Sequence, residues 1–214
     1  MTGRVASVNL AVVTVAPWAG DPSGRSGIDK RPVPGRVGLH AQGVAGDFVA
    51  ETSVHGGPDK AVYSYAREDA AWWSEELGRE IPPGGFGENL STDGVDVTGA
   101  VIGERWEVGG ALLEVSQPRT PCRTFAGFWD VQDLIKRFTA RAFPGAYLRV
   151  LRDGEVGAGD LVTVVHRPAH GVTVGEAFRA LNTSPELLPR LLDVPELPEH
   201  LRERVVRRTA GVSG

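Results

Sequence analysis

Short runs of apolar and β-branched residues recur along the first three-quarters of the chain, and glycine-rich turns separate them. Glycine accounts for 28 of the 214 residues. The runs that fit β-strands are residues 4–16, 36–40, 61–66, 105–108, 111–116, 146–152 and 161–166. Many short strands between glycine turns are typical of a closed barrel or a sandwich, and not of a parallel sheet with crossover helices. The sequence therefore predicts a mainly β fold.

Two pairs of these runs are predicted to form hairpins. Gly109-Gly110 joins 105–108 to 111–116, and a two-residue connection of this kind suits a tight hairpin. Glycine-rich turns also lie between 146–152 and 161–166. We therefore expect those two strands to pair with each other as well.

Two helices interrupt the strand pattern. Residues 67–77 form the first and end at Gly78, which suits the left-handed residue after a helix. Residues 128–142 carry an apolar stripe at helical spacing, and Pro144-Gly145 stops it. The stripe is interpreted as part of the hydrophobic core.

The pattern changes to short helices after Pro168. Thr173 and Glu176 form a capping box that begins the first, Ser184-Pro185 begins the second, and a proline-bounded segment separates the third. The arginines of the third helix are interleaved with glutamates, which indicates a solvated face. We therefore expect a barrel domain over residues 1–168 and a small three-helix domain over residues 169–214.

Composition excludes several classes of protein. With 41% hydrophobic and 23% charged residues, the chain can bury a substantial core. The net charge of −4 gives no attraction to a nucleic-acid polymer. No segment approaches the roughly 20 apolar residues of a membrane helix, and the first 16 residues lack the features of a secretory signal. A single cysteine cannot form an internal disulfide, so we expect a cytoplasmic protein.

That cysteine, Cys122, lies in the run Ser116-Gln117-Pro118-Arg119-Thr120-Pro121-Cys122-Arg123. The two prolines fix their own backbone angles and favour an extended conformation at the residues before them, so the thiol is held on an ordered segment. Arginines near a thiol favour the thiolate, which attacks electrophiles and binds metals. The alternative is a buried, inert cysteine that acts as a small apolar side chain.

Two glycine-rich loops offer backbone N–H groups to an anion. They are His55-Gly56-Gly57 and Gly84-Gly85-Phe86-Gly87, and glycine lets several amides point at one ligand. Lys60, Asn89 and Arg119 could add charge and directed hydrogen bonds. Each loop taken alone is better explained as a tight turn between strands. Together with the thiol, they favour a site for an anionic ligand with a soft metal.

Other chemistries find less support in the sequence. The five histidines do not lie at zinc-finger spacing from the cysteine, and no phosphate-binding loop of the Gly-x-x-x-x-Gly-Lys-Ser/Thr type occurs. A nucleophile pair of Cys122 with His55 as base stays open, because the two residues need only meet in space.

The order of these motifs resembles the MOSC domain family, and within it the YiiM-like branch. The resemblance covers residues 4 to 168 and rests mainly on four separated motifs. They are His55-Gly56-Gly57-Pro58-Asp59-Lys60, Gly84 to Leu90, Leu113 to Cys122, and Tyr147-Leu148-Arg149-Val150. It implies a closed MOSC-type β-barrel with a few interspersed helices, followed by a small C-terminal three-helix domain.

The resemblance also implies a cofactor, the molybdenum cofactor of the molybdopterin type, with Cys122 bonding molybdenum through sulfur. A soft thiolate suits a metal that is already held by dithiolene sulfurs. The residues implied to bind the cofactor are Lys30, His55, Gly56, Gly57, Lys60, Phe86, Asn89, Arg119 and Cys122. His55 or Glu88 would deliver protons.

The activity implied is reduction of N-hydroxylated compounds, such as hydroxylaminopurine bases, to amines. A flavin or iron–sulfur reductase would supply electrons, and neither a nucleic-acid polymer nor a membrane is expected as partner. The C-terminal helices could form a homodimer, dock the donor or close the pocket. Two alternatives stay open: a cofactor carrier or sulfur-transfer protein without reductase activity, and a metal-free cysteine hydrolase.

Overall fold

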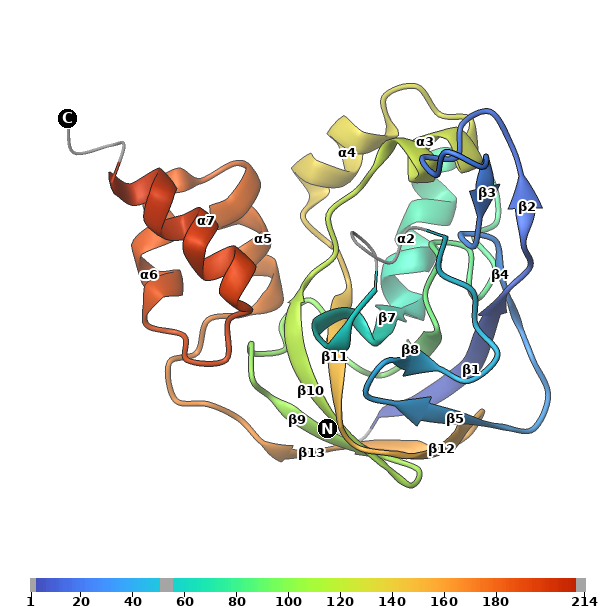
Figure 1. Ribbon diagram of the computed structural model, residues 1–214, viewed down its shortest axis with the longest axis horizontal. Helices are drawn as coiled ribbons and strands as arrows, with labels where there is room; N and C mark the ends of the chain where they lie inside the picture. The colour runs from blue at the N-terminus through green and yellow to red at the C-terminus, as the bar shows by residue number, and fades with distance from the viewer. Residues whose placement is uncertain (1–2, 51–55, 211–214) are drawn as a thin grey trace.

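The computed structural model describes residues 3–50 and 56–210, and seven of the strands in these residues close into a β-barrel (Figure 1). In order around the barrel they are β13 (Leu161–His166), β9 (Arg105–Val108), β10 (Ala111–Pro118), β11 (Ala146–Arg152), β7 (Val62–Ala66), β8 (Leu90–Asp93) and β1 (Gly3–Ala11). The pairing of β1 with β13 closes the ring. Neighbouring strands are antiparallel except β7 and β8, which run parallel. The predicted mainly β, closed-barrel fold is confirmed.

Alternation along the strands places apolar side chains inside the barrel. On β9, Trp106 and Val108 are buried while Arg105 and Glu107 are exposed. The next strand, β10, is buried along most of its length because a C-terminal helix covers its outer face. The strand that leads to Cys122 is therefore held from both sides.

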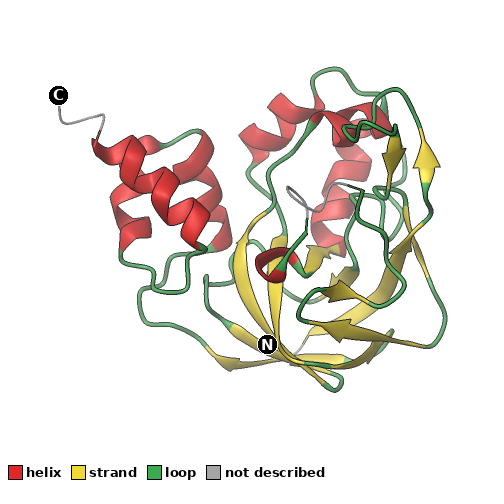
Figure 2. Cartoon of the chain, viewed as in Figure 1, coloured by secondary structure: helices red, strands yellow, loops and turns green. Residues whose placement is uncertain are grey.

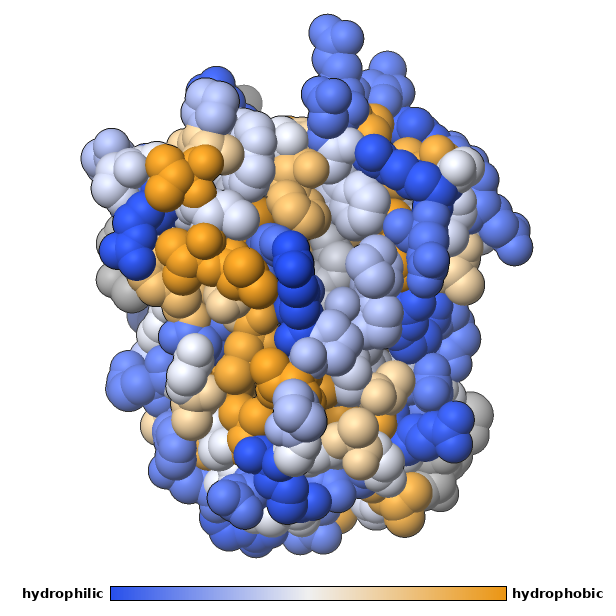
Figure 3. Space-filling view, turned by 90° about the vertical axis from the view of Figure 1, so that its right-hand side faces the viewer, coloured by the Kyte–Doolittle hydropathy of each residue, from blue (hydrophilic) through white to orange (hydrophobic). Residues whose placement is uncertain are grey.

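The predicted strand over 4–16 is divided in the structure. β1 ends at Ala11, and the chain resumes as β2 (Thr14–Val15), which pairs with β3 (Arg25–Ser26) outside the barrel. The valines at the break, Val12 and Val13, are exposed, as is Val15. Figure 3 shows apolar side chains gathered on this side of the molecule among polar ones. β4 (Lys30–Pro32) then returns to pair with the end of β1.

The predicted hairpin of 146–152 with 161–166 is wrong, although both strands exist. Between them the chain forms β12 (Gly154–Gly157), which pairs with β5 (Arg36–His40). β5 also pairs with β6 (Gly43–Val44) in this small second sheet. β13 instead continues to β9 and β1. The local turn signals are real, but long-range pairing decides which strands they join.

Three helices lie to one side of the barrel strands: α2 (Arg67–Leu77), α3 (Arg123–Trp129) and α4 (Leu134–Arg141) (Figure 2). The predicted helix over 67–77 is confirmed, and Gly78 ends it in the left-handed conformation with φ 63°. Aromatic rings hold this layer together. Trp73 of α2 stacks on Phe138 of α4 with 5.7 Å between ring centroids, and Phe86 meets both rings edge-on.

The single helix predicted over 128–142 is wrong, because the chain breaks there into α3 and α4. Asp130 adopts a left-handed conformation, with φ 50°, and ends α3. Contacts from distant segments fix this end: the Trp129 indole donates to the Gly85 carbonyl at 2.9 Å, and Arg79 donates to the Trp129 carbonyl. Apolar spacing continues across the break, so periodicity alone cannot reveal it.

The C-terminal helices are α5 (Val174–Asn182), α6 (Leu188–Leu192) and α7 (Glu199–Ala210), and a 3₁₀ turn, η2 (Pro185–Leu187), leads into α6. The predicted cap of α5 is confirmed, since the Thr173 hydroxyl accepts from the Glu176 N–H at 3.1 Å. Buried residues of these helices belong to the same hydrophobic core as the barrel. The longest helix, α7, has 12 residues, and no helix among the described residues could cross a membrane.

The solvated face predicted for α7 holds only in part. Arg207 pairs with Glu203 at the surface. Arg202, however, donates to the carbonyls of Leu192 and Val194, and Arg208 donates to the Leu181 carbonyl at 2.7 Å. These arginines fasten α7 to the preceding helices.

Candidate functional site

A cavity of about 190 Å³ opens beside Cys122. Its wall combines the starts of β7 and β11 and the segment after β10 with residues before and between β3 and β4 and the loops on either side of β6. Charged and polar lining residues include Lys30, Lys60, Asn89, Arg119, Cys122 and Tyr147. The structure therefore brings the thiol together with cations from three separated motifs.

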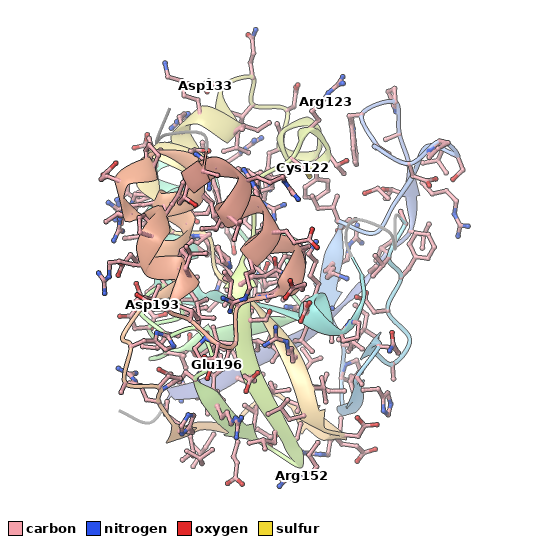
Figure 4. The ribbon with its side chains drawn as sticks, turned by 60° about the vertical axis from the view of Figure 1, so that its left-hand side comes forward. Cys122, Arg123, Asp133, Arg152, Asp193 and Glu196 are labelled. Carbon is pink, nitrogen blue, oxygen red and sulfur yellow. The ribbon has the colours of Figure 1, made fainter. Side chains whose placement is uncertain are left out.

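Cys122 occupies the residue before the first turn of α3, in an extended conformation. Figure 4 shows Cys122 and Arg123 where this helix begins. The thiol is partly exposed, and it lines the cavity. Gln117 is extended within β10, as the following proline predicts, so the segment leading to the thiol is anchored to the barrel. The alternative of a sealed, inert cysteine does not fit this position.

Arg119 is a buried cation of the cavity wall, with 6% of its surface exposed. Its guanidinium lies over the Phe125 ring at 4.2 Å and near the rings of Tyr63 and Phe138. Among the described residues, no group accepts a hydrogen bond from its Nη1 atom. Burying a charged donor without an acceptor is costly, so this atom is suited to an anion supplied by a ligand.

Lys30 and Asn89 also line the cavity, but both are engaged by one carboxylate. Lys30 forms a buried ion pair with Asp47, and the Asn89 amide donates to the same Asp47 oxygen at 2.8 Å. Burial lowers the pKa of Lys30, and Asp47 acts in the opposite direction. The backbone N–H of Ala11 donates to the other Asp47 oxygen. The network ties the loop before residue 50 to β1 and to the start of β8.

The loop 84–87 does not offer its amides to a ligand, contrary to the prediction. The Gly84 and Phe86 N–H groups donate to the Glu88 carboxylate at 2.7 and 3.0 Å. Those of Gly85 and Gly87 donate to backbone carbonyls. The glycines do let the loop amides converge on an anion, as the sequence indicated, but that anion is the carboxylate of Glu88 and not a ligand. Phe86 itself lines the cavity, although only 1% of its surface is exposed.

Glu88 is accordingly placed within the wall and does not line the cavity. It is 1% exposed, and the Ser91 hydroxyl donates to it at 2.8 Å in addition to the loop amides. Burial raises its pKa, while these hydrogen bonds lower it. The geometry gives Glu88 a structural task in folding the loop, and a proton from it would have no direct route to a ligand.

The first glycine motif is described in part. Gly56 and Lys60 line the cavity, whereas Gly57 does not line it and precedes the short 3₁₀ helix η1 (Pro58–Lys60) with φ 91°. Burial lowers the pKa of the Lys60 ammonium, and Asp59 opposes that effect. His55, predicted as a cofactor ligand and proton donor, lies outside the described residues.

Sequence reasoning overlooked two residues of the cavity wall, Asp47 and Tyr147. Tyr147 begins the Tyr147-Leu148-Arg149-Val150 motif and Asp47 follows Gly46, but neither residue was assigned a role from the sequence. Their approach to Cys122 depends on contacts between segments far apart in the chain. Tyr147, for example, is brought there because β11 pairs with β10, a contact no local pattern specifies.

Most strands of the barrel and Cys122 lie within residues 51–163, and the MOSC domain profile matches these residues. The chain belongs to the MOSC domain family.

Similar proteins extend the match beyond that profile. Protein YiiM of Escherichia coli is 37% identical over 161 residues, which cover 73% of this chain and 71% of YiiM. A protein named reductase from Gibberella moniliformis is 33% identical over 177 residues, which cover 79% of this chain and 31% of that protein. The crystal structure of YiiM from Geobacillus stearothermophilus superposes with a TM-score of 0.80 at 27% identity and covers 96% of this chain and 98% of that one.

Proposed function

We propose that this protein is a molybdenum-cofactor-dependent oxidoreductase that reduces N-hydroxylated compounds to amines, with Cys122 as the protein ligand to molybdenum. The observation that carries the proposal is the shared cavity of a partly exposed thiol and a buried guanidinium whose Nη1 atom has no hydrogen-bond partner in the part of the chain that the structure describes. Membership of the MOSC family and similarity to a protein named reductase support it.

The residues present fit such a cofactor. A thiolate is a suitable ligand for a soft metal, and the Arg119 guanidinium is suited to two parallel hydrogen bonds with a phosphate. When bound, the cofactor would supply the two-electron redox chemistry at the metal. Cys122 would hold the metal, and Arg119 would neutralise the anionic part. The pair of Lys30 with Asp47 would keep the cavity wall in place.

The substrate and partners follow from the same proposal. Two electrons and two protons convert R–NHOH into R–NH₂ and water, so an electron donor of the flavin or iron–sulfur class is required. The protein named reductase is long enough to carry further domains beside the matching region, since this chain spans 31% of it. We expect a small N-hydroxylated substrate and a cytoplasmic location.

Metal analysis tests the role of the thiol. Protein produced in a host that makes the cofactor is expected to contain about one molybdenum per chain, and Cys122→Ala is expected to lose at least 90% of it. Cys122→Ser keeps the size of the side chain but replaces the soft ligand with a hard one, so it should lose molybdenum as well. Equal metal in all three proteins would contradict the proposal.

An activity assay separates the proposed enzyme from a cofactor carrier. With a chemical reductant and a hydroxylaminopurine base, the wild-type protein is expected to form the amine, and Cys122→Ala is expected to form none. Molybdenum binding without turnover of any N-hydroxylated compound would identify a carrier or sulfur-transfer protein. A covalent adduct on Cys122 in metal-free protein would identify a cysteine hydrolase.

A further inference from the structure

Tyr147 belongs to the cavity that holds Cys122 and Arg119. It lies on β11, where the register pairs it with Gln117 of β10 and Tyr63 of β7. Its ring is 5.3 Å from the Tyr63 ring, and the side chain is partly exposed. Two neighbouring strands therefore fix the ring, while the cavity leaves it accessible.

The hydroxyl of Tyr147 differs from those of the other two tyrosines of the chain. Tyr63 donates to the Pro144 carbonyl at 2.8 Å, and Tyr65 donates to the Phe143 carbonyl at 3.1 Å. Among the described residues, no group forms a hydrogen bond with the Tyr147 hydroxyl. Burial and Cys122 raise the pKa of Tyr147, and Arg119 opposes them. The hydroxyl therefore carries its proton at neutral pH and has it available for a ligand.

Other acids near the cavity are less well placed. Glu88 is enclosed by the amides of its own loop, and the Lys30 ammonium faces Asp47 in a buried pair. Lys60 also lines the cavity and is a rival donor, since an ammonium carries a proton at neutral pH.

We propose that Tyr147 is the proton donor to the oxygen that leaves the substrate; this inference rests on the proposed function. In the reaction R–NHOH + 2 e⁻ + 2 H⁺ → R–NH₂ + H₂O, the N–O bond breaks and nitrogen is reduced. The bound molybdenum cofactor would supply the two electrons, and an external donor would replace them. The Tyr147 hydroxyl gives one proton to the departing hydroxyl oxygen, so that it leaves as water. Solvent in the cavity returns that proton and supplies the second one to nitrogen.

A comparison of leaving groups tests the proton transfer. Hydroxide is a strong base and needs a proton to leave, whereas acetate leaves without one. General acid catalysis contributes about 10²–10⁴-fold to a rate. Tyr147→Phe is therefore expected to lower kcat at least 100-fold with 6-hydroxylaminopurine. With the O-acetyl ester of this compound, the factor by which kcat falls should be at least ten times smaller. Molybdenum content should stay at the wild-type level.

Three outcomes would overturn the inference while leaving the proposed function intact. They are an equal loss on both substrates, no loss on either, and a substrate-selective loss in Lys60→Met in place of Tyr147→Phe. An inactive wild-type protein without molybdenum would overturn the proposed function itself, and the inference with it.

Chemical modification gives a readout that needs no cofactor or turnover. N-Acetylimidazole acetylates accessible tyrosine hydroxyls, and peptide mapping of the treated protein is expected to find O-acetyltyrosine at Tyr147 and not at Tyr63 or Tyr65. Tyr147→Phe should carry none. A Tyr147 that resists acetylation while Tyr63 or Tyr65 reacts would contradict the accessible hydroxyl on which the inference depends.

Discussion

Arg119 and Arg123 flank the thiol in sequence, and their environments differ completely. Arg119 is buried in the cavity wall over Phe125, whereas Arg123 is exposed on the first turn of α3 and does not line the cavity. Arg119 follows strand β10 and its side chain enters the cavity wall, whereas Arg123 begins α3 and its side chain faces solvent. Of the two arginines, only Arg119 is placed to contact a ligand bound at Cys122.

This difference leads to a prediction for the pair. Arg119→Gln is expected to lower molybdenum content at least tenfold, because the anionic part of the cofactor loses its guanidinium. Its free energy of unfolding should change by no more than about 1 kcal/mol, since a lost cation–π contact offsets the relieved desolvation of an unpartnered charge. The measurements are metal analysis and urea denaturation.

Arg123→Gln is the matched control, and it should keep both the metal and the stability. Wild-type molybdenum content in Arg119→Gln would show that the buried guanidinium does not serve the cofactor.

At the scale of elements, the loop 84–87 shows how closely a turn is fitted to its surroundings. Gly84 has φ 81°, and an added Cβ would lie 2.3 Å from the Lys30 carbonyl oxygen. Gly35 has the same φ, but nothing lies within 4 Å of its added Cβ. Both glycines require a left-handed backbone conformation, but only Gly84 lacks room for a Cβ atom.

Alanine at these two positions separates the two effects. Gly35→Ala is expected to cost about 1–2 kcal/mol, the cost of a left-handed conformation with a side chain. Gly84→Ala should cost about 2 kcal/mol more, because the backbone of Lys30 must also move. Urea denaturation of both variants provides the difference. Equal costs would mean that the loop moves freely away from β4.

Two hydrophobic clusters connect the C-terminal helices to the rest of the molecule, one shared with the barrel strands and one with the aromatic layer of α2, α3 and α4. Phe178 of α5 is fully buried, and its ring meets Phe138 of α4 with 6.4 Å between centroids. Although residues 169–214 were predicted as a separate domain, contacts of this kind join α5 to α4 and to the barrel. We expect the helices and the barrel to unfold together.

Phe178→Ala tests this coupling. The lost burial should lower the free energy of unfolding by about 3–5 kcal/mol. All five tryptophans precede residue 168, so their fluorescence reports on the barrel region. That signal should shift in the variant together with circular dichroism. Val206→Ala on the exposed side of α7 is the control. Unchanged fluorescence in Phe178→Ala would show two independent domains.

A second prediction at this scale concerns pH. Burial raises the pKa of Asp69 on α2 to about 6, while the Thr98 hydroxyl and Arg141 act against that shift and Asp96 and Glu68 add to it. The folded state binds this proton more tightly than the unfolded state, so the contribution to stability is present below pH 4 and is lost as pH rises to about 6.

Asp69→Asn replaces the carboxyl group with an amide of similar size that is uncharged at all pH values. It should leave stability unchanged near pH 4 and raise it at pH 7.5 by about 1–2 kcal/mol, less than the full pKa shift implies because the group is only partly buried. Denaturation curves at both pH values measure this, and Asp193→Asn at an exposed position is the control. An increase in the free energy of unfolding that is the same at both pH values would contradict the assignment of this pH dependence to Asp69.

Local chemistry made much of the fold predictable. Gly78 and Thr173 ended and began helices as expected, because a left-handed residue and a capping hydroxyl act within a few residues of themselves. The strand segments and the proline-framed thiol of Cys122 were likewise visible, since alternation and proline geometry are local properties.

The sequence by itself determined which segments are strands and that Cys122 lies on an ordered segment, because backbone preferences act over a few residues. Only the tertiary structure decided that β13 pairs with β9 and β1, that Glu88 takes the amides of its loop, and that Arg119 and Tyr147 share the cavity with Cys122. The physical reason is that barrel closure brings together residues far apart in the chain, and burial then decides which charges are paired and which stay open to a ligand.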